Sequence, residues 1–329
     1  MKNKKFGVFI GKKAIKLIFL LVIVSIASFW LVEQAPIDPV KVYIGAMSIT
    51  PEQKVILEEY WGVNTPAREK YFNWVGSILK GDLGDSLIYR MPVSDVIKER
   101  FTASLALMAS AWLLSGILGF ILGIAAGMKS GTWIDKAIKT YCYILLATPT
   151  FWLALIMLLV FSVYLGWFPI GLGVPLGITN EDVTFLDRMK HLILPAITLS
   201  LLGVATIAMF TREKLIEVMS SDYVLFAKAR GESGLSLVLR HGVRNVALPA
   251  ITLQFLGFSE LFGGAVLVEQ VFSYPGLGRA AVEAGLRSDV PLLLGIVIIS
   301  TLFVFIGNLI ADIIYEFVDP RIKQQEMKT

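Results

Sequence analysis

The side chains of this sequence that can do chemistry are few and far apart. The chain has two histidines, His191 and His241, and one cysteine, Cys142. A single cysteine cannot form a disulfide within the chain, and it offers no thiolate cage for a metal ion. We therefore expect no metal site and no cofactor bound by this chain.

Ser259 and Glu260 are a second candidate for chemistry, because they lie inside a long apolar run. An intramembrane protease would need a histidine beside Ser259, but His191 and His241 lie at or beyond the ends of apolar runs. An ion-coupled transporter would need buried carboxylates, and Glu260 is the one carboxylate in the middle of a predicted span. Both classes stay as distant alternatives. We expect Glu260 to line a water-filled translocation pathway, because an ionised carboxylate is costly in lipid.

The segment Gly7–Lys13, GVFIGKK, superficially resembles a phosphate-binding loop. It has three residues between the glycines where that motif needs four, and no serine or threonine follows its lysines. We therefore expect no nucleotide site here.

Composition defines the class of protein. Hydrophobic residues make up 56% of the 329 residues and charged residues only 17%, and the mean hydropathy is +0.71. Soluble proteins carry about 25% charged residues, so this is a polytopic membrane protein. The net charge of +4 comes from lysines and arginines beside the apolar runs, which suits anionic membrane lipid better than nucleic acid.

Six transmembrane helices are predicted from the apolar runs, each near the roughly 20 residues that span a bilayer. The first could be read as a secretory leader, but it is long and no small-x-small cleavage site precedes Glu33, so we keep it as a span. Pro149 is expected to kink the third span. The predicted spans are Leu17–Val32, Phe101–Met128, Tyr141–Val163, Leu192–Thr211, Leu248–Val268 and Pro291–Ala311.

The polar segments between the spans define the expected domains. Residues 1–32 form the N-terminus and first span, 33–100 an aromatic-rich extracytoplasmic subdomain, 101–318 the transmembrane core and 319–329 a cytoplasmic tail. Residues 165–190 and 269–290 are expected to be loops. Within the second span, Gly119, Gly123 and Gly127 form a stripe of small residues that lets another helix approach closely.

The segment Asp222–Pro249 is basic, although it lies between two spans. Ser220, Ser221 and Asp222 are N-cap candidates for a short helix that ends at Gly231, a residue suited to positive φ. A second, amphipathic helix is predicted from Leu235, with one face made by Leu235, Val238, Leu239, Gly242 and Val246. This segment is either a platform for another protein or a solvated connection.

Lysine and arginine are concentrated at residues 2–16, 129–139, 212–244 and 321–328. The positive-inside rule therefore places both termini and the segment 212–247 in the cytoplasm, and residues 33–100 outside. The predicted localisation is the cell (inner) membrane.

Ordered motifs run along nearly the whole chain. The chain resembles a permease subunit of the peptide/nickel branch of binding-protein-dependent ATP-binding-cassette importers, of the dipeptide/oligopeptide B type. The resemblance implies a type I importer permease fold. The matching motifs are Pro36-Ile-Asp-Pro39 (with Ile37 in place of Gly), Gly81-Asp-Leu-Gly-Asp-Ser86 with Pro92-Val93 and Ile97–Arg100, Pro149–Trp152 with Gly166-Trp167, His191–Pro195, Val271–Gly278 and Asp319–Ile322.

The family's ATPase-docking loop, the EAA loop, maps by resemblance onto the basic segment. Ala227-Lys-Ala-Arg-Gly231, His241, Asn245 and Pro249 match the AxAxG…H…N…P form, while Leu225 and Phe226 replace the E-A of the general motif. The residues implied in ATPase coupling are Asp222, Tyr223, Ala227, Ala229, Arg230, Gly231, His241 and Asn245.

The resemblance also implies the partners. They are a second permease subunit in a heterodimer, two cytoplasmic ATPase subunits that bind ATP and Mg²⁺, an extracellular solute-binding lipoprotein and membrane lipid. This chain would contribute half of the pathway and no catalytic residue. The cargo is expected to be peptides, with nickel or a metal chelate as the alternative.

Overall fold

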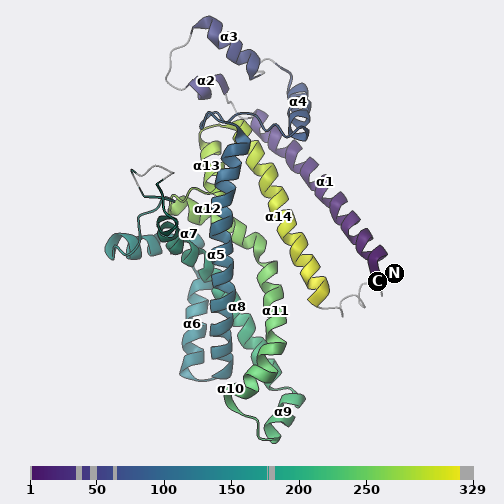
Figure 1. Cartoon of the computed structure of the whole chain (residues 1–329), viewed down its shortest axis with the longest axis vertical. Helices are drawn as coiled ribbons and strands as arrows, with labels where there is room; N and C mark the ends of the chain where they lie inside the picture. Colours follow the sequence, from purple (N-terminus) through teal and green to yellow (C-terminus); the bar gives the residue numbers. More distant parts are fainter. Residues whose placement is uncertain are drawn as a thin grey trace. The chain divides into compact units, whose positions relative to one another are not determined.

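The structure is a computed structural model, and it describes residues 2–34, 39–44, 50–61, 65–175, 177 and 182–318. The described part is almost entirely helical, with one isolated β-bridge between Asp85 and Pro92. The predicted all-α membrane fold is therefore confirmed. The helices are α1 Lys2–Gln34, α2 Pro39–Ile44, α3 Pro51–Tyr60, α4 Ala67–Leu79, α5 Val93–Met128, α6 Trp133–Ala147, α7 Thr150–Met157, the π-helix η1 Leu158–Tyr164, α8 Phe185–Met219, α9 Asp222–Ala229, α10 Gly234–Leu237, the π-helix η2 Val238–Val243, α11 Arg244–Leu256, α12 Phe258–Val271, α13 Leu277–Leu286 and α14 Val290–Val318 (Figure 1).

Four described helices are long and apolar enough to cross a membrane, within α1, α5, α8 and α14. Two bent helix pairs also qualify, so the described chain has six candidate spans if each pair counts as one. The pair α6 and α7–η1 bends by 109° at Thr148–Pro149, and the pair α10–α11 and α12 bends by 53° at Gly257. Pro149 lacks a backbone N–H and disfavours helical geometry at Thr148, whose ψ is 124°. The predicted kink is therefore a full break in the helix.

The chain divides into two compact units, and α5 and α14 contribute to both. Unit 1 is Met1–Ser104 with Gly276–Ile306, and unit 2 is Leu105–Pro275 with Gly307–Thr329. The domain limits predicted at residues 32, 100 and 318 stay a prediction; residue 100 lies inside α5, which begins at Val93. Most of the Pro36–Pro39 motif and the whole segment 319–329 lie outside the described residues.

Unit 1 is organised around a buried carboxylate, Asp289, just before α14. The Ser86 hydroxyl donates a hydrogen bond of 2.5 Å to Asp289 Oδ2, and the Ile88 N–H donates to the same oxygen at 3.0 Å. Within the same motif, the Gly84 N–H donates to Asp82 Oδ1 at 2.9 Å, while Gly84 has φ +78°. Ser86, at the end of the Gly81–Ser86 motif, therefore helps to satisfy a buried acid, while the bond between Gly84 and Asp82 shapes the loop before it.

Both loop predictions were wrong in part, because α8 already begins at Phe185 within 165–190 and the segment 269–290 contains α13. Leu277, Ala280 and Ala284 of this helix are buried in the same cluster as Val93 and Leu292. The helix begins where the Leu277 N–H donates to the Ser104 hydroxyl at 2.7 Å. The helix is short and has glycines around it, so its sequence shows no clear helical periodicity. A helix of this length depends on tertiary burial for its stability.

In unit 2, the glycine stripe of α5 lies against α8 as predicted. A Cβ added to Gly123 would stand 2.5 Å from Thr211 Cβ and 2.7 Å from the Ala208 carbonyl oxygen. Comparable clashes would occur at Gly119 and Gly127. The absence of side chains therefore sets the distance between the two helices.

We expect Gly123→Ala to destabilise the protein by about 1–3 kcal/mol, because one added carbon must push the two helices apart. Gly76→Ala is the matched control, since Gly76 lies in α4 with open space around its Cβ position. Thermal unfolding of both variants in detergent, followed by size-exclusion chromatography, measures the difference. Equal stability of the two variants would contradict close packing of α5 on α8.

Candidate functional site

The platform, which we define as residues 222–247, begins with α9. Ser221 occupies the N-cap position, but its hydroxyl donates to the Val218 carbonyl and makes no side-chain cap. After the helix, Gly231 has φ +89° and its N–H donates to the Lys228 carbonyl at 2.9 Å. The predicted short helix and its closure at Gly231 are confirmed.

The inner face of α9 packs on the rest of the platform. Val224 and Ala227 form a buried cluster with Leu237 of α10, against Val218 and Met219. The opposite face carries large apolar side chains in the open: Leu225 is 50% exposed, Phe226 66%, and Tyr223 about as much as Leu225. Leu225 and Phe226 are the residues that replace the E-A pair of the general motif.

The second platform helix differs from its prediction. It runs through α10, η2 and α11 without a gap, and its middle is a π-helix. The π-helix hydrogen-bonds from i to i+5, so it shifts the register on which a 3.6-residue pattern depends. Of the five residues predicted on one face, Val238, Gly242 and Val246 are buried, as is Leu237, whereas Leu235 and Leu239 are exposed.

Hydrogen bonds join α9 and the turn that follows it to the second platform helix. His241 Nε2 lies 3.0 Å from Glu232 Oε2, and this contact lowers the pKa of the Glu232 carboxyl. The Asn245 amide donates to the Tyr223 hydroxyl at 3.2 Å and to the His241 carbonyl at 2.7 Å. Three residues assigned to coupling by resemblance, Tyr223, His241 and Asn245, therefore lie together. Glu232 was not predicted, because an acid among basic residues carries no pattern of its own.

The other residues assigned to coupling divide by exposure. Asp222, Ala229, Arg230 and Gly231 are exposed, and Ala227 is buried inside the platform. The exposed residues are available to a partner protein, whereas Ala227 packs α9 against the rest of the platform. The described part of the chain therefore offers a contact surface made by one side of α9.

A buried ion pair holds α6 to α8 shortly before the platform. Arg212 donates to both carboxylate oxygens of Asp135, with Nη2 2.8 Å from Oδ2. The Gly131 N–H donates to the same Asp135 Oδ2 at 2.9 Å. Asp135 is 1% exposed, so its charge depends on Arg212 for compensation. Nothing in the sequence pattern pointed to this pair.

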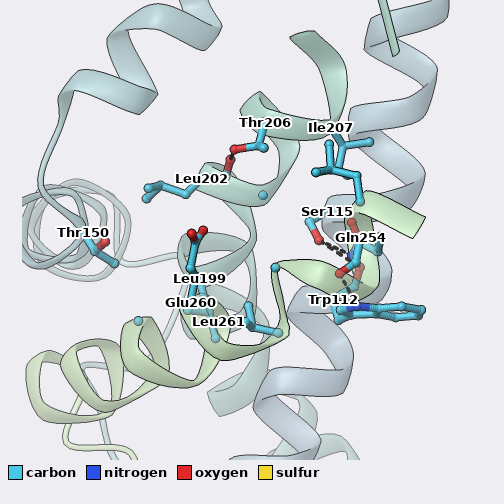
Figure 2. Close-up of a pocket in the computed structure, with 14 residues that line it drawn as sticks. Trp112, Ser115, Thr150, Leu199, Leu202, Thr206, Ile207, Gln254, Glu260 and Leu261 are labelled. Atoms are coloured by element: carbon cyan, nitrogen blue, oxygen red, sulfur yellow. Dashed lines mark hydrogen bonds between the residues drawn. The ribbon is translucent and has the colours of Figure 1, made fainter. Parts of the chain in front are cut away.

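Glu260 lies in the first turn of α12, three residues after the break at Gly257. It is exposed, and it lines a cavity of about 120 Å³ in unit 2. Figure 2 shows its carboxylate directed into the space framed by Thr150, Leu202 and Thr206. Trp112, Ser115 and Gln254 form another part of the wall.

The residues of the protease alternative are engaged elsewhere. The Ser259 hydroxyl donates to Asn308 Oδ1 at 2.8 Å. His191 Nδ1 lies 2.9 Å from the Gly171 carbonyl, and His241 contacts Glu232. A serine nucleophile requires a histidine within hydrogen-bond reach, and neither histidine has this relation to Ser259.

Taken together, the candidate spans of the described residues, the two bent helix pairs and the platform between α8 and α11 are those of a polytopic membrane protein. The comparisons with known proteins agree. The family model described as "Binding-protein-dependent transport system inner membrane component" matches residues 119–324, and the model of its N-terminal part, "Binding-prot-dependent transport system membrane comp, N-term", matches residues 7–108. The chain belongs to this family.

Similar curated proteins cover nearly its whole length. The chain is 35% identical to the oligopeptide transport system permease protein AppB of Bacillus subtilis, over 96% of this chain and 99% of the relative. It is 34% identical to the di/tripeptide transport system permease protein DppB of Pseudomonas aeruginosa, over 92% and 94%. It is 31% identical to the glutathione transport system permease protein GsiC of Salmonella choleraesuis, over 96% and 98%.

Proposed function

We propose that this chain is the permease subunit of an ATP-driven importer that carries peptides. It forms half of the translocation pathway, beside a second permease subunit, and it contributes no catalytic residue. Two cytoplasmic ATPase subunits bind ATP and Mg²⁺; one docks on the platform of this chain and the other on the matching segment of the second permease subunit. An extracellular binding protein delivers the cargo. The relatives named for oligopeptide, di/tripeptide and glutathione transport favour peptide over nickel or a chelate.

The observation that carries this proposal is the exposed apolar side of α9. Leu225 and Phe226 are large apolar side chains on a polar, basic segment between two spans. A soluble connection has no reason to gather such side chains on one short helix, whereas the buried core of a protein interface is rich in aromatic and apolar residues. The charged residues beside them, Asp222 and Arg230, fit a polar rim.

The proposed coupling is mechanical. The ATPase subunits close on ATP, and the two docked platforms move toward each other. Bonds from Glu232 and Asn245 hold the platform as one piece, so α9 transmits its displacement to α8 and α11 as a rigid lever. The pathway then opens to the loaded binding protein, and ATP hydrolysis resets it. With this arrangement both termini and the platform are cytoplasmic, in the cell (inner) membrane.

The test is reconstitution of the chain with the second permease, the ATPases and the binding protein in proteoliposomes. We expect the loaded binding protein to stimulate ATP hydrolysis and to drive uptake of a labelled peptide. Omission of this chain should abolish both. Uptake that persists without the ATPases and follows an imposed ion gradient would show the ion-coupled transporter instead.

A further inference from the structure

We propose that the cavity beside Glu260 is a binding subsite for one cationic side chain of the cargo, a lysine ammonium or an arginine guanidinium. This inference rests on the proposed importer function and deepens it. The cavity measures about 120 Å³, well below the roughly 300–1,000 Å³ of pockets that enclose a whole small ligand. It therefore accommodates a single group and leaves the rest of a peptide outside.

The first argument is the charge of the wall. Glu260 makes no hydrogen bond or ion pair within the described residues, and no lysine, arginine or histidine of those residues lines the cavity. Its place in the first turn of α12 favours a negative charge, because the N-terminal end of a helix carries a partial positive charge. The helix end thus stabilises the negative charge of Glu260, but the lining residues supply no positive charge to pair with it. A cationic ligand can supply that charge.

The second argument is the use of hydrogen-bond donors around the cavity. Both N–H groups of the Gln254 amide are engaged, one with the Trp112 carbonyl at 2.7 Å and one with the Ser115 hydroxyl at 2.8 Å. The Trp112 indole N–H donates to the Gln254 carbonyl at 3.2 Å. The hydroxyls of Ser115 and Thr206 donate to the carbonyls of Trp112 and Leu202.

What remains in this part of the wall is mostly acceptors. The carboxylate of Glu260 and the side-chain oxygen of Gln254 can accept hydrogen bonds from a ligand. The Thr150 hydroxyl can accept or donate one. A ligand that brings donors and a positive charge satisfies this wall. A carboxylate or phosphate would leave the acceptors unpaired and face Glu260 with like charge. The unused acceptors in the wall therefore favour a ligand that donates hydrogen bonds. The charge of Glu260 independently favours a cation, which is the same kind of ligand.

The experiment uses the complete reconstituted importer and three tripeptides that differ only in the central residue, lysine, norleucine or glutamate. The affinity of the binding protein for each peptide is measured separately, so that its selectivity can be divided out. We expect Glu260→Gln to lower uptake of the lysine peptide about tenfold or more, because a charge-assisted hydrogen bond is lost. Uptake of the norleucine peptide should stay within about twofold. Glu260→Asp, which keeps the charge, should retain most of the lysine preference.

The outcomes separate the subsite from the importer. An equal fall for all three peptides, which share the same N-terminal ammonium, would show that Glu260 does not recognise the side-chain charge, and no change for any peptide would remove it from the pathway; either result overturns the subsite. ATP hydrolysis stimulated by the binding protein, measured beside each uptake assay in the wild-type complex, reports separately whether the importer itself is intact. A wild-type complex that moves none of the peptides would overturn the proposed function, and the subsite with it.

Discussion

Ala229→Glu is expected to uncouple the importer, with stimulated ATP hydrolysis falling about tenfold or more toward its basal rate. Ala229 is exposed on α9, so the new carboxylate meets water when the chain is alone. In the assembled complex the same charge would be desolvated against the ATPase, at a cost above the roughly 1.4 kcal/mol that corresponds to tenfold. Membrane insertion and stability of the isolated chain should be unchanged.

Ser130→Glu is the matched control, because Ser130 is exposed in the turn between α5 and α6, which is predicted to lie on the same side of the membrane. It adds the same charge outside the platform and should leave coupling intact. The measurement is ATP hydrolysis with and without loaded binding protein, together with co-purification of the ATPases. Normal stimulation in Ala229→Glu would refute docking on this side of α9.

Gly231 gives an independent probe of the same surface. Gly231→Pro cannot adopt φ +89° and loses the N–H that donates to Lys228. Gly231→Asn keeps that N–H and tolerates positive φ. We expect the proline variant to lose coupling and the asparagine variant to keep most of it, a contrast that a merely solvated loop would not produce.

Asp135→Asn is expected to destabilise the transmembrane core by about 3–5 kcal/mol, because it leaves the largely buried Arg212 without its counter-charge. The asparagine keeps an oxygen for Arg212 and for the Gly131 N–H, so the change tests charge more than shape. Thermal unfolding of the purified chain in detergent measures the loss.

The double variant Asp135→Leu with Arg212→Met separates the cost of an unpaired buried charge from the cost of altered packing. Replacement of a buried ion pair by apolar residues is often neutral, whereas breaking it is costly. We therefore expect the double variant to recover most of the stability that Asp135→Asn loses. A double variant as unstable as the single one would mean that the local packing, and not the unpaired charge, determines stability here.

The spans were predictable because bilayer thickness imposes a length on any uncharged run. Their ends were less so. The first helix turns of α5 carry Lys98, Glu99 and Arg100, so the uncharged run begins at Phe101 although the helix begins at Val93. Charged residues mark the end of the apolar run, but the backbone hydrogen bonds of the helix continue beyond that end. The helix is therefore longer than the span predicted from hydropathy.

In and near the platform, features that depend on a single residue were predictable from the sequence, whereas features that depend on residues far apart were not. Gly231 closes α9 through its own backbone freedom, and this was predicted from one residue. The prediction assumed one α-helical period through a segment that contains a π-helix, and two of its five face residues, Leu235 and Leu239, are exposed. The pairing of Asp135 with Arg212 joins residues 77 positions apart, and neither residue carries a local signal of its partner.

The bonds that tie Tyr223 and Glu232 to the second platform helix have a consequence for assembly. They close within one chain, so the hairpin needs no partner to complete them. Docking then incurs little entropy of ordering, and a preformed surface binds more tightly than a flexible one with the same contacts. In the proposed docking, the platform therefore presents its surface to an ATPase without a further folding step.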